Sequence, residues 1–75
     1  MRRKEIRQRV GAAIQALPPR QREVIELRLL GELSLEEISE TVGLTLGGVK
    51  STLHNAIARL RESLADLEEL TYVKM

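Results

Sequence analysis

Several kinds of residue are scarce in this chain of 75 residues, and each absence excludes a class of protein. There is no cysteine, so the chain can form neither a disulfide framework nor a thiolate metal site. Tyr72 is the only aromatic residue, and no segment alternates apolar and polar side chains, which argues against a β-sheet. No apolar run approaches the roughly 20 residues of a membrane-spanning helix, and no signal-peptide segment follows the basic start. We therefore expect a soluble, cytoplasmic protein.

The net charge of +1 conceals a segregation of charges along the chain. Residues 1–28 carry +5, residues 29–49 carry −4, residues 50–61 carry +3 and residues 62–75 carry −3. The two basic stretches are candidate surfaces for nucleic acid, but they are equally the solvated faces that most helices possess. Charge alone therefore does not select a nucleic-acid-binding function.

The apolar residues recur at spacings of three and four, which predicts an all-α fold. We expect one compact four-helix domain over residues 1–75, ending in a helix-turn-helix with a long recognition helix. Pro18 ends the first helix and Pro19 suits the first position of the second, while Gly31 closes the second. The expected buried residues of the second helix are Val24, Leu27 and Ile25. The predicted helices cover about 3–16, 19–30, 34–42 and 46–68.

Residues 34–57 carry the most informative pattern of the chain. Ser39 is followed four residues later by Gly43 and six residues after that by Val49, the spacing of a helix-turn-helix. The small serine leaves room for two helices to cross, and the glycine adopts the left-handed turn conformation without steric strain. The valine fills the space between the helices. Two helices joined by so short a turn must cross at a steep angle.

Side-chain caps mark where both of these helices begin. Ser34 and Glu37 form a predicted capping box, and Thr45 is placed to cap the second helix. That helix has an apolar face formed by Val49, Leu53, Ala56 and Leu60. Its outward row is Lys50, Ser51, His54 and Asn55. This row is polar and slightly cationic, which suits the major groove of DNA.

A resemblance to a known family covers about two-thirds of the chain, from about Leu17 to Leu64. Region 4 of bacterial sigma factors, particularly of the extracytoplasmic-function group, is similar to the segment LPPRQREVIELRLLGELSLEEISETVGLTLGGVKSTLHNAIARLRE. Response-regulator helix-turn-helix domains share the PRxREV opening and the VK pair. The spacing from Arg28 through Leu33 and Ser34, and the ending LHxAxxRLRE, favour the sigma-factor interpretation.

The resemblance implies that double-stranded DNA and the RNA polymerase core are partners. Region 4 of that family binds the promoter minus-35 element and docks on the flap of the polymerase β subunit, and in many members an anti-sigma factor covers the same domain. The residues that would face the major groove are Lys50, Ser51, His54 and Asn55. Arg28, together with Arg20 or Arg22, would contact backbone phosphate. The implied function is promoter recognition in transcription initiation or its regulation.

The chain also departs from the family pattern. Gly47 is followed by Gly48, where threonine is common; this pair either lets the backbone at Gly47 approach a phosphate closely or weakens the first helical turn. Thr52, Asn55 and Ile57 stand where basic residues are common, so DNA binding should be weak. Region 2 is not recognisable, so we expect either a fragment of a longer sigma factor or a small stand-alone relative.

Two other functions fit the sequence. The thin positive charge of the recognition helix and the acidic, leucine-rich tail fit a protein-interaction module that binds polymerase or an anti-sigma-like regulator. An apolar seam could alternatively pair two copies as a dimeric regulator, although packing on the first helix explains it more simply; the seam is Leu53, Leu60, Leu64, Leu67 and Leu70. We expect no cofactor, metal or catalytic site, because the single histidine, His54, has no convergent ligands and the glutamates of residues 36–40 have no nucleophile beside them.

Overall fold

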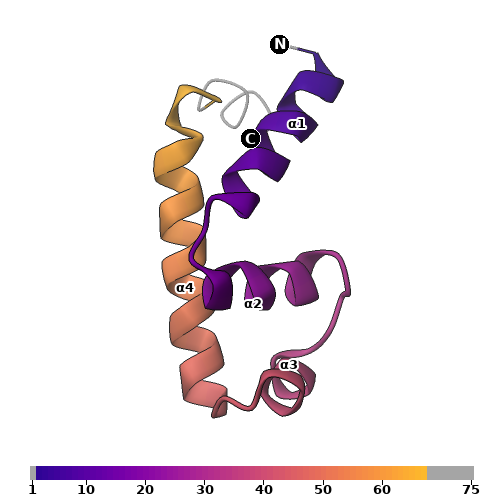
Figure 1. The fold of residues 1–75 in the computed structure, drawn as a ribbon, viewed down its shortest axis with the longest axis vertical. Coiled ribbons are helices and arrows are strands. Elements are labelled where there is room, and N and C mark those ends of the chain that lie inside the picture. Colours follow the sequence, from indigo (N-terminus) through magenta and orange to yellow (C-terminus); the bar gives the residue numbers. More distant parts are fainter. Residues whose placement is uncertain (1, 68–75) are drawn as a thin grey trace, which may run out of the picture.

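The computed structural model describes residues 2–67, which fold into four α-helices and a short 3-10 turn without any strand (Figure 1). This confirms the predicted all-α class. None of the helices in this range is long and apolar enough to cross a bilayer. The elements are α1 (Arg3–Gln15), α2 (Pro19–Leu29), α3 (Leu35–Val42), α4 (Leu46–Ser63) and the 3-10 turn η1 (Ala65–Leu67).

Helix α4 is the axis of the molecule. Its 18 residues give it a length of about 27 Å, and the other three helices lie along one side of it (Figure 1). Helix α2 runs across α4 and contacts all three other helices, whereas α1 and α3 contact α2 and α4 but not each other. The helix-turn-helix of α3 and α4 is therefore held from one side by α2.

Two small hydrophobic clusters form the core of the described residues. The first joins Ile14, Leu17, Ile25 and Ala56, and the second joins Val24, Ile38 and Val49. Val24 and Ile25 are adjacent in sequence, so their side chains leave α2 in different directions and each enters a different cluster. Leu27 was expected to be buried with them but is only partly buried, at the edge of the second cluster.

The end of α2 uses its glycine differently from the prediction. Gly31 follows the helix as expected, but the residue with the positive φ is Glu32, at 54°. Gly31 is needed because a Cβ there would lie 2.8 Å from Cδ1 of Leu33 and 2.9 Å from the carbonyl oxygen of Leu27. The same carbonyl accepts the N–H of Leu33 at 3.1 Å. The chain thus turns back so tightly that only glycine fits.

Helix α4 ends at Ser63, five residues earlier than predicted. The chain then forms η1, which brings Asp66 onto α1, where its Oδ1 accepts a hydrogen bond from Nη2 of Arg9 at 2.7 Å. Leu60 of the predicted apolar seam packs on the first cluster beside Val10 of α1. The predicted seam residue Leu70 lies outside the described residues.

Candidate nucleic-acid interface

The capping box at the start of α3 has the predicted form. The backbone N–H of Glu37 donates to Oγ of Ser34 at 3.1 Å, and the N–H of Ser34 donates to Oε1 of Glu37 at 2.8 Å. The hydrogen bond that the Ser34 backbone N–H donates to the Glu37 carboxylate, with a smaller contribution from the Ser34 side chain, holds the pKa of Glu37 below its ordinary value. The cap fixes where α3 begins, eight residues before the turn.

The turn between α3 and α4 is held from within by Ser39. Gly43 has a φ of 73°, the left-handed conformation expected for it, and its N–H donates to the carbonyl oxygen of Ser39 at 3.0 Å. The Ser39 hydroxyl also donates to the carbonyl oxygen of Leu44, on the far side of the glycine. Sequence reasoning assigned Ser39 only the role of a small residue and missed this bond.

Val49 packs where three helices meet. It is fully buried and contacts Val24 of α2 and Ile38 of α3, which are also fully buried. This confirms the predicted role of the valine between the two helices. Burial of these branched side chains fixes the orientation of α4 about its own axis, because turning the helix would move Val49 out of the cluster.

That orientation decides which side chains face solvent. The face opposite Val49 and Ala56 presents the predicted recognition residues, and each of them is exposed: Lys50, Ser51, His54 and Asn55. At 3.6 residues per turn, Lys50 and His54 form one row along the helix, and Ser51 and Asn55 form the next. The structure therefore brings all four onto one continuous solvent-facing surface.

The two glycines at the start of α4 serve different purposes. The N–H of Gly48 donates to Oγ1 of Thr45 at 3.0 Å, and a Cβ on Gly48 would lie only 3.2 Å from that same oxygen. Gly48 thus lets the cap close. A Cβ on Gly47 would meet nothing within 4 Å, so packing does not require a glycine there. Gly47 leaves a bare, exposed stretch of backbone in line with Ser51 and Asn55.

Two exposed apolar residues accompany this surface and were not predicted as part of it. Leu46, the first residue of α4, is 38% exposed, and Ile57 is 39% exposed. They are eleven residues apart, about three turns, and so lie on the same flank of the helix beside Lys50. Their apolar character alone could not have identified them, because only the fold shows which leucines and isoleucines stay outside the core.

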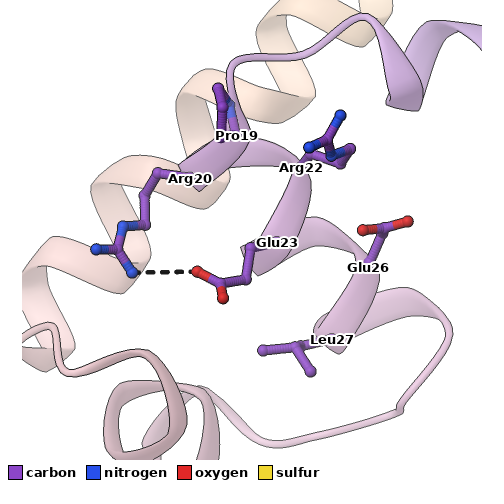
Figure 2. A pocket seen from close by; sticks show the side chains of 6 residues that line it. All are labelled: Pro19, Arg20, Arg22, Glu23, Glu26 and Leu27. Carbon is purple, nitrogen blue, oxygen red and sulfur yellow. Dashed lines mark hydrogen bonds and ion pairs between the residues drawn. The ribbon is translucent and has the colours of Figure 1, made fainter.

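The three arginines predicted to contact phosphate each donate a hydrogen bond to a backbone carbonyl. Arg20 donates from Nη1 to the carbonyl oxygen of Val42 at 3.1 Å, and the same nitrogen lies 3.1 Å from Oε1 of Glu23 (Figure 2). Arg22 donates to the carbonyl oxygen of Gln15 at 3.3 Å, and Arg28 donates to that of Leu33 at 2.8 Å. Each arginine therefore folds back onto the main chain of a different helix connection.

The outer face of α2 carries an open depression of about 680 Å³. Its lining mixes both signs of charge with apolar side chains (Figure 2): Pro19, Arg20, Arg22, Glu23, Glu26 and Leu27. Beyond it, Leu29 and Leu30 are 56% and 76% exposed. The end of α2 that bears this leucine pair points away from α4 (Figure 1).

The sequence is similar to known proteins over the helices that form this surface. Residues 7–60 match the family model described as sigma-70, region 4. The chain is 50% identical over 52 residues to the RNA polymerase sigma-E factor of Streptomyces antibioticus, a match that covers 69% of this chain and 29% of that protein. It is 40% identical over 57 residues to the ECF RNA polymerase sigma factor RpoE of Cereibacter sphaeroides, covering 76% of this chain and 32% of that protein.

A more distant relative gives the same result. The chain is 38% identical over 63 residues to the ECF RNA polymerase sigma factor SigW of Bacillus subtilis, with 84% of this chain and 34% of that protein covered. The matched segment thus spans about a third of the length of these relatives. Because the family match includes α2, the turn and the exposed row of α4, this chain belongs to the sigma-70 region 4 family, in its extracytoplasmic-function branch.

Proposed function

We propose that this domain binds the minus-35 element of a promoter, with the first half of α4 in the major groove, and so serves transcription initiation. The observation that carries the proposal is the exposed polar row of α4, set on a helix whose opposite face is locked into the core by Val49 and Ala56. An α-helix fits the major groove of B-DNA, where each base pair presents a distinct set of donors and acceptors. The match to the sigma-70 region 4 family supports a DNA-binding role for this helix-turn-helix.

Each side chain of the row has a chemistry that suits it to part of the duplex. Asn55 can pair through two hydrogen bonds with an adenine edge, and Ser51 can bond to several bases. Lys50 can reach guanine O6 and N7 or a phosphate, and the histidine can donate or accept. The exposed methyl groups of Leu46 can contact a thymine methyl at the entrance of the helix. The bare backbone at Gly47 can approach a phosphate directly.

Fluorescence anisotropy with labelled duplexes tests this proposal. The chain should prefer a minus-35-like duplex over a scrambled one, and its affinity should fall steeply as salt rises because phosphate contacts release counterions. Equal, weak binding to both duplexes would contradict promoter recognition. The protein-interaction function described above would then be the better account of the fold.

Substitutions on the row distinguish contacts with phosphate from contacts with bases. Replacing Lys50 with alanine should lower affinity for both duplexes and reduce the slope of log affinity against log salt by about one. Replacing Ser51 with alanine should lower the preference for the promoter duplex and leave the salt slope unchanged. If both substitutions leave binding as it was, the proposed face of α4 is wrong.

The leucine pair at the end of α2 supports docking to RNA polymerase. Leu29 and Leu30 are large apolar side chains left exposed next to each other in sequence at the end of α2, and neighbouring exposed apolar side chains are typical of protein-binding surfaces. Replacing Leu30 with glutamate should weaken capture of the domain by the polymerase core, whereas affinity for DNA should not fall, since this end of α2 points away from α4. Capture that is unchanged by the substitution would exclude this surface.

A further inference from the structure

The arginines of α2 share a feature that their spacing in sequence does not show. Each donates a hydrogen bond to a backbone carbonyl at a different connection between helices. Arg22 reaches the last residue of α1, and Arg28 reaches the loop between α2 and α3. Arg20 reaches Val42, the last residue of α3 and the neighbour of the turn glycine Gly43. Helix α2 thus ties down all three connections from a central position.

The contact made by Arg20 is favourable in two ways. The last carbonyls of a helix lack partners within it, and the C-terminus of a helix carries partial negative charge, so a guanidinium group is well placed there. The carboxylate of Glu23, one turn along α2, holds the guanidinium on that side of the helix (Figure 2). Both side chains are about half exposed, so their ion pair itself adds little stability, and its effect is to orient Arg20.

The turn is thereby fixed from outside as well as from within. Ser39 makes two hydrogen bonds around Gly43, but both lie inside the helix-turn-helix and move with it. Among the hydrogen bonds of the described residues, the one from Arg20 to Val42 is the bond that joins α2 to this turn. It acts two residues before Leu44 and four before Leu46, where α4 starts. A shift of the turn against α2 would therefore tilt the recognition helix.

We propose that Arg20 is a positioning residue for DNA recognition, which sets the direction of α4 by fixing the α3–α4 turn against α2, and is not a phosphate contact. This inference rests on the proposed function, because a direction matters only if α4 enters a groove. Arg20 was selected from the sequence as a phosphate clamp, so the two roles must be told apart by measurement.

The salt dependence of binding separates the two roles. A side chain that neutralises a phosphate contributes about 0.9 to the salt slope for B-DNA. A side chain that only positions the recognition helix contributes nothing to the slope, although its loss weakens every base contact at once. Removing a phosphate contact therefore lowers both the affinity for DNA and the salt slope, whereas removing a positioning residue lowers the affinity alone.

The test compares Arg20→Met with Lys50→Ala by anisotropy on the promoter-like duplex over a series of salt concentrations. Methionine keeps most of the apolar stem of the arginine and removes its donors. We expect Arg20→Met to lower affinity about tenfold with the wild-type slope, and Lys50→Ala to reduce the slope by about one. A slope reduced by about one in Arg20→Met would overturn the inference in favour of a phosphate contact.

A second pair of variants leaves Arg20 in place. Glu23→Gln removes the carboxylate that orients the guanidinium, and Glu26→Gln is its matched control, one turn further along α2 with the same change of charge. We expect Glu23→Gln to bind DNA more weakly than Glu26→Gln. Tighter binding by Glu23→Gln would mean that the carboxylate competes with phosphate for Arg20, and it would overturn the inference.

The hydrogen bond can also be examined without DNA. The carbonyl of Val42 and the N–H of Gly43 belong to one peptide group, so loss of the bond from Arg20 should shift the amide ¹⁵N resonance of Gly43. The shift should appear in Arg20→Met and be absent in Lys50→Ala. An unshifted resonance in Arg20→Met would overturn the positioning role, because the turn would then not depend on this arginine.

Thermal unfolding distinguishes a positioning role of Arg20 from a purely structural one. If Arg20→Met lowers the unfolding temperature but leaves DNA affinity unchanged in the cold, where the variant is folded, the role is purely structural and the inference fails. Failure of the proposed function would give a different result, because the wild-type chain itself would then show no preference between the promoter-like and scrambled duplexes. Wild-type preference with an unaffected Arg20→Met variant overturns only the positioning role.

Discussion

Glu32 carries the one positive φ of a residue other than glycine among residues 2–67. A side chain in the left-handed conformation costs roughly 1–2 kcal/mol, of which a glycine would recover part after its own entropic cost. We expect Glu32→Gly to raise the free energy of unfolding by about 0.5–1 kcal/mol, measured by urea denaturation. The matched change Gly31→Ala should lower it, because the added Cβ would meet the backbone of α2. The opposite order of stabilities would refute this account of the turn.

Single residues also show where sequence reasoning succeeds. Ser34 and Gly43 were assigned correctly because each acts within a few residues of its own position, through a cap or a turn conformation. Val49 was assigned correctly because helical spacing places it on the apolar face of α4. Arg20 and Arg28 were expected to reach outward, and their carbonyl partners were missed. Helical spacing shows that an arginine is on the surface, but only the packing of helices shows which carbonyl lies within its reach.

At the scale of the helix, two helical glycines with free space around them can be replaced in parallel as a matched pair of variants. Gly47 lies in the first turn of α4 and Gly11 lies inside α1, and a Cβ on either would meet nothing within 4 Å. Replacing either with alanine should therefore stabilise the fold by about 0.5–1 kcal/mol in thermal or urea unfolding. We expect only Gly47→Ala to weaken DNA binding, because its methyl group would stand between the backbone and phosphate. Equal affinities for the two variants would remove Gly47 from the interface.

The bounds of the helices were predicted well where a nearby residue determines them and poorly where a distant contact does. The starts of α3 and α4 match the prediction within a residue, since the caps at Ser34 and Thr45 are encoded locally. The end of α4 was predicted five residues too late. Nothing beside Ser63 in the sequence shows that Asp66 folds back to Arg9, which is 57 residues away along the chain. Lys50, Ser51, His54 and Asn55 share one exposed face, as predicted, because one helical period determines which residues of α4 lie together.

For the molecule as a whole, we expect two carboxylates to make stability depend on pH. The hydrogen bond from Arg9 holds the pKa of Asp66 below its ordinary value, and the hydrogen bond from the backbone N–H of Ser34 does the same for Glu37. A carboxylate with a lowered pKa in the folded state contributes stability that is complete above its unfolded pKa and is lost as the pH falls through its folded pKa. The unfolding temperature should therefore drop below about pH 4, the ordinary range of carboxyl groups.

Circular dichroism at neutral and acidic pH measures this dependence. Asp66→Asn and Glu37→Gln should each lower the unfolding temperature at neutral pH and make it less sensitive to acid, because the group that titrates has been removed. Glu36→Gln is the matched control, since Glu36 lies in the same first turn of α3. A pH profile that stays identical in both test variants would show that other groups govern the acid response.

The division of the core between two clusters has a consequence for local unfolding of the domain. Helices α2 and α4 belong to both clusters, whereas α1 supports only the first and α3 only the second. Opening of α1 would leave Val24, Ile38 and Val49 packed together, so its amide hydrogens should exchange with solvent at a lower free energy than those in the middle of α4. Hydrogen exchange followed by mass spectrometry would reveal this order. The half of the domain that contains the helix-turn-helix would then persist through openings that release its N-terminal helix.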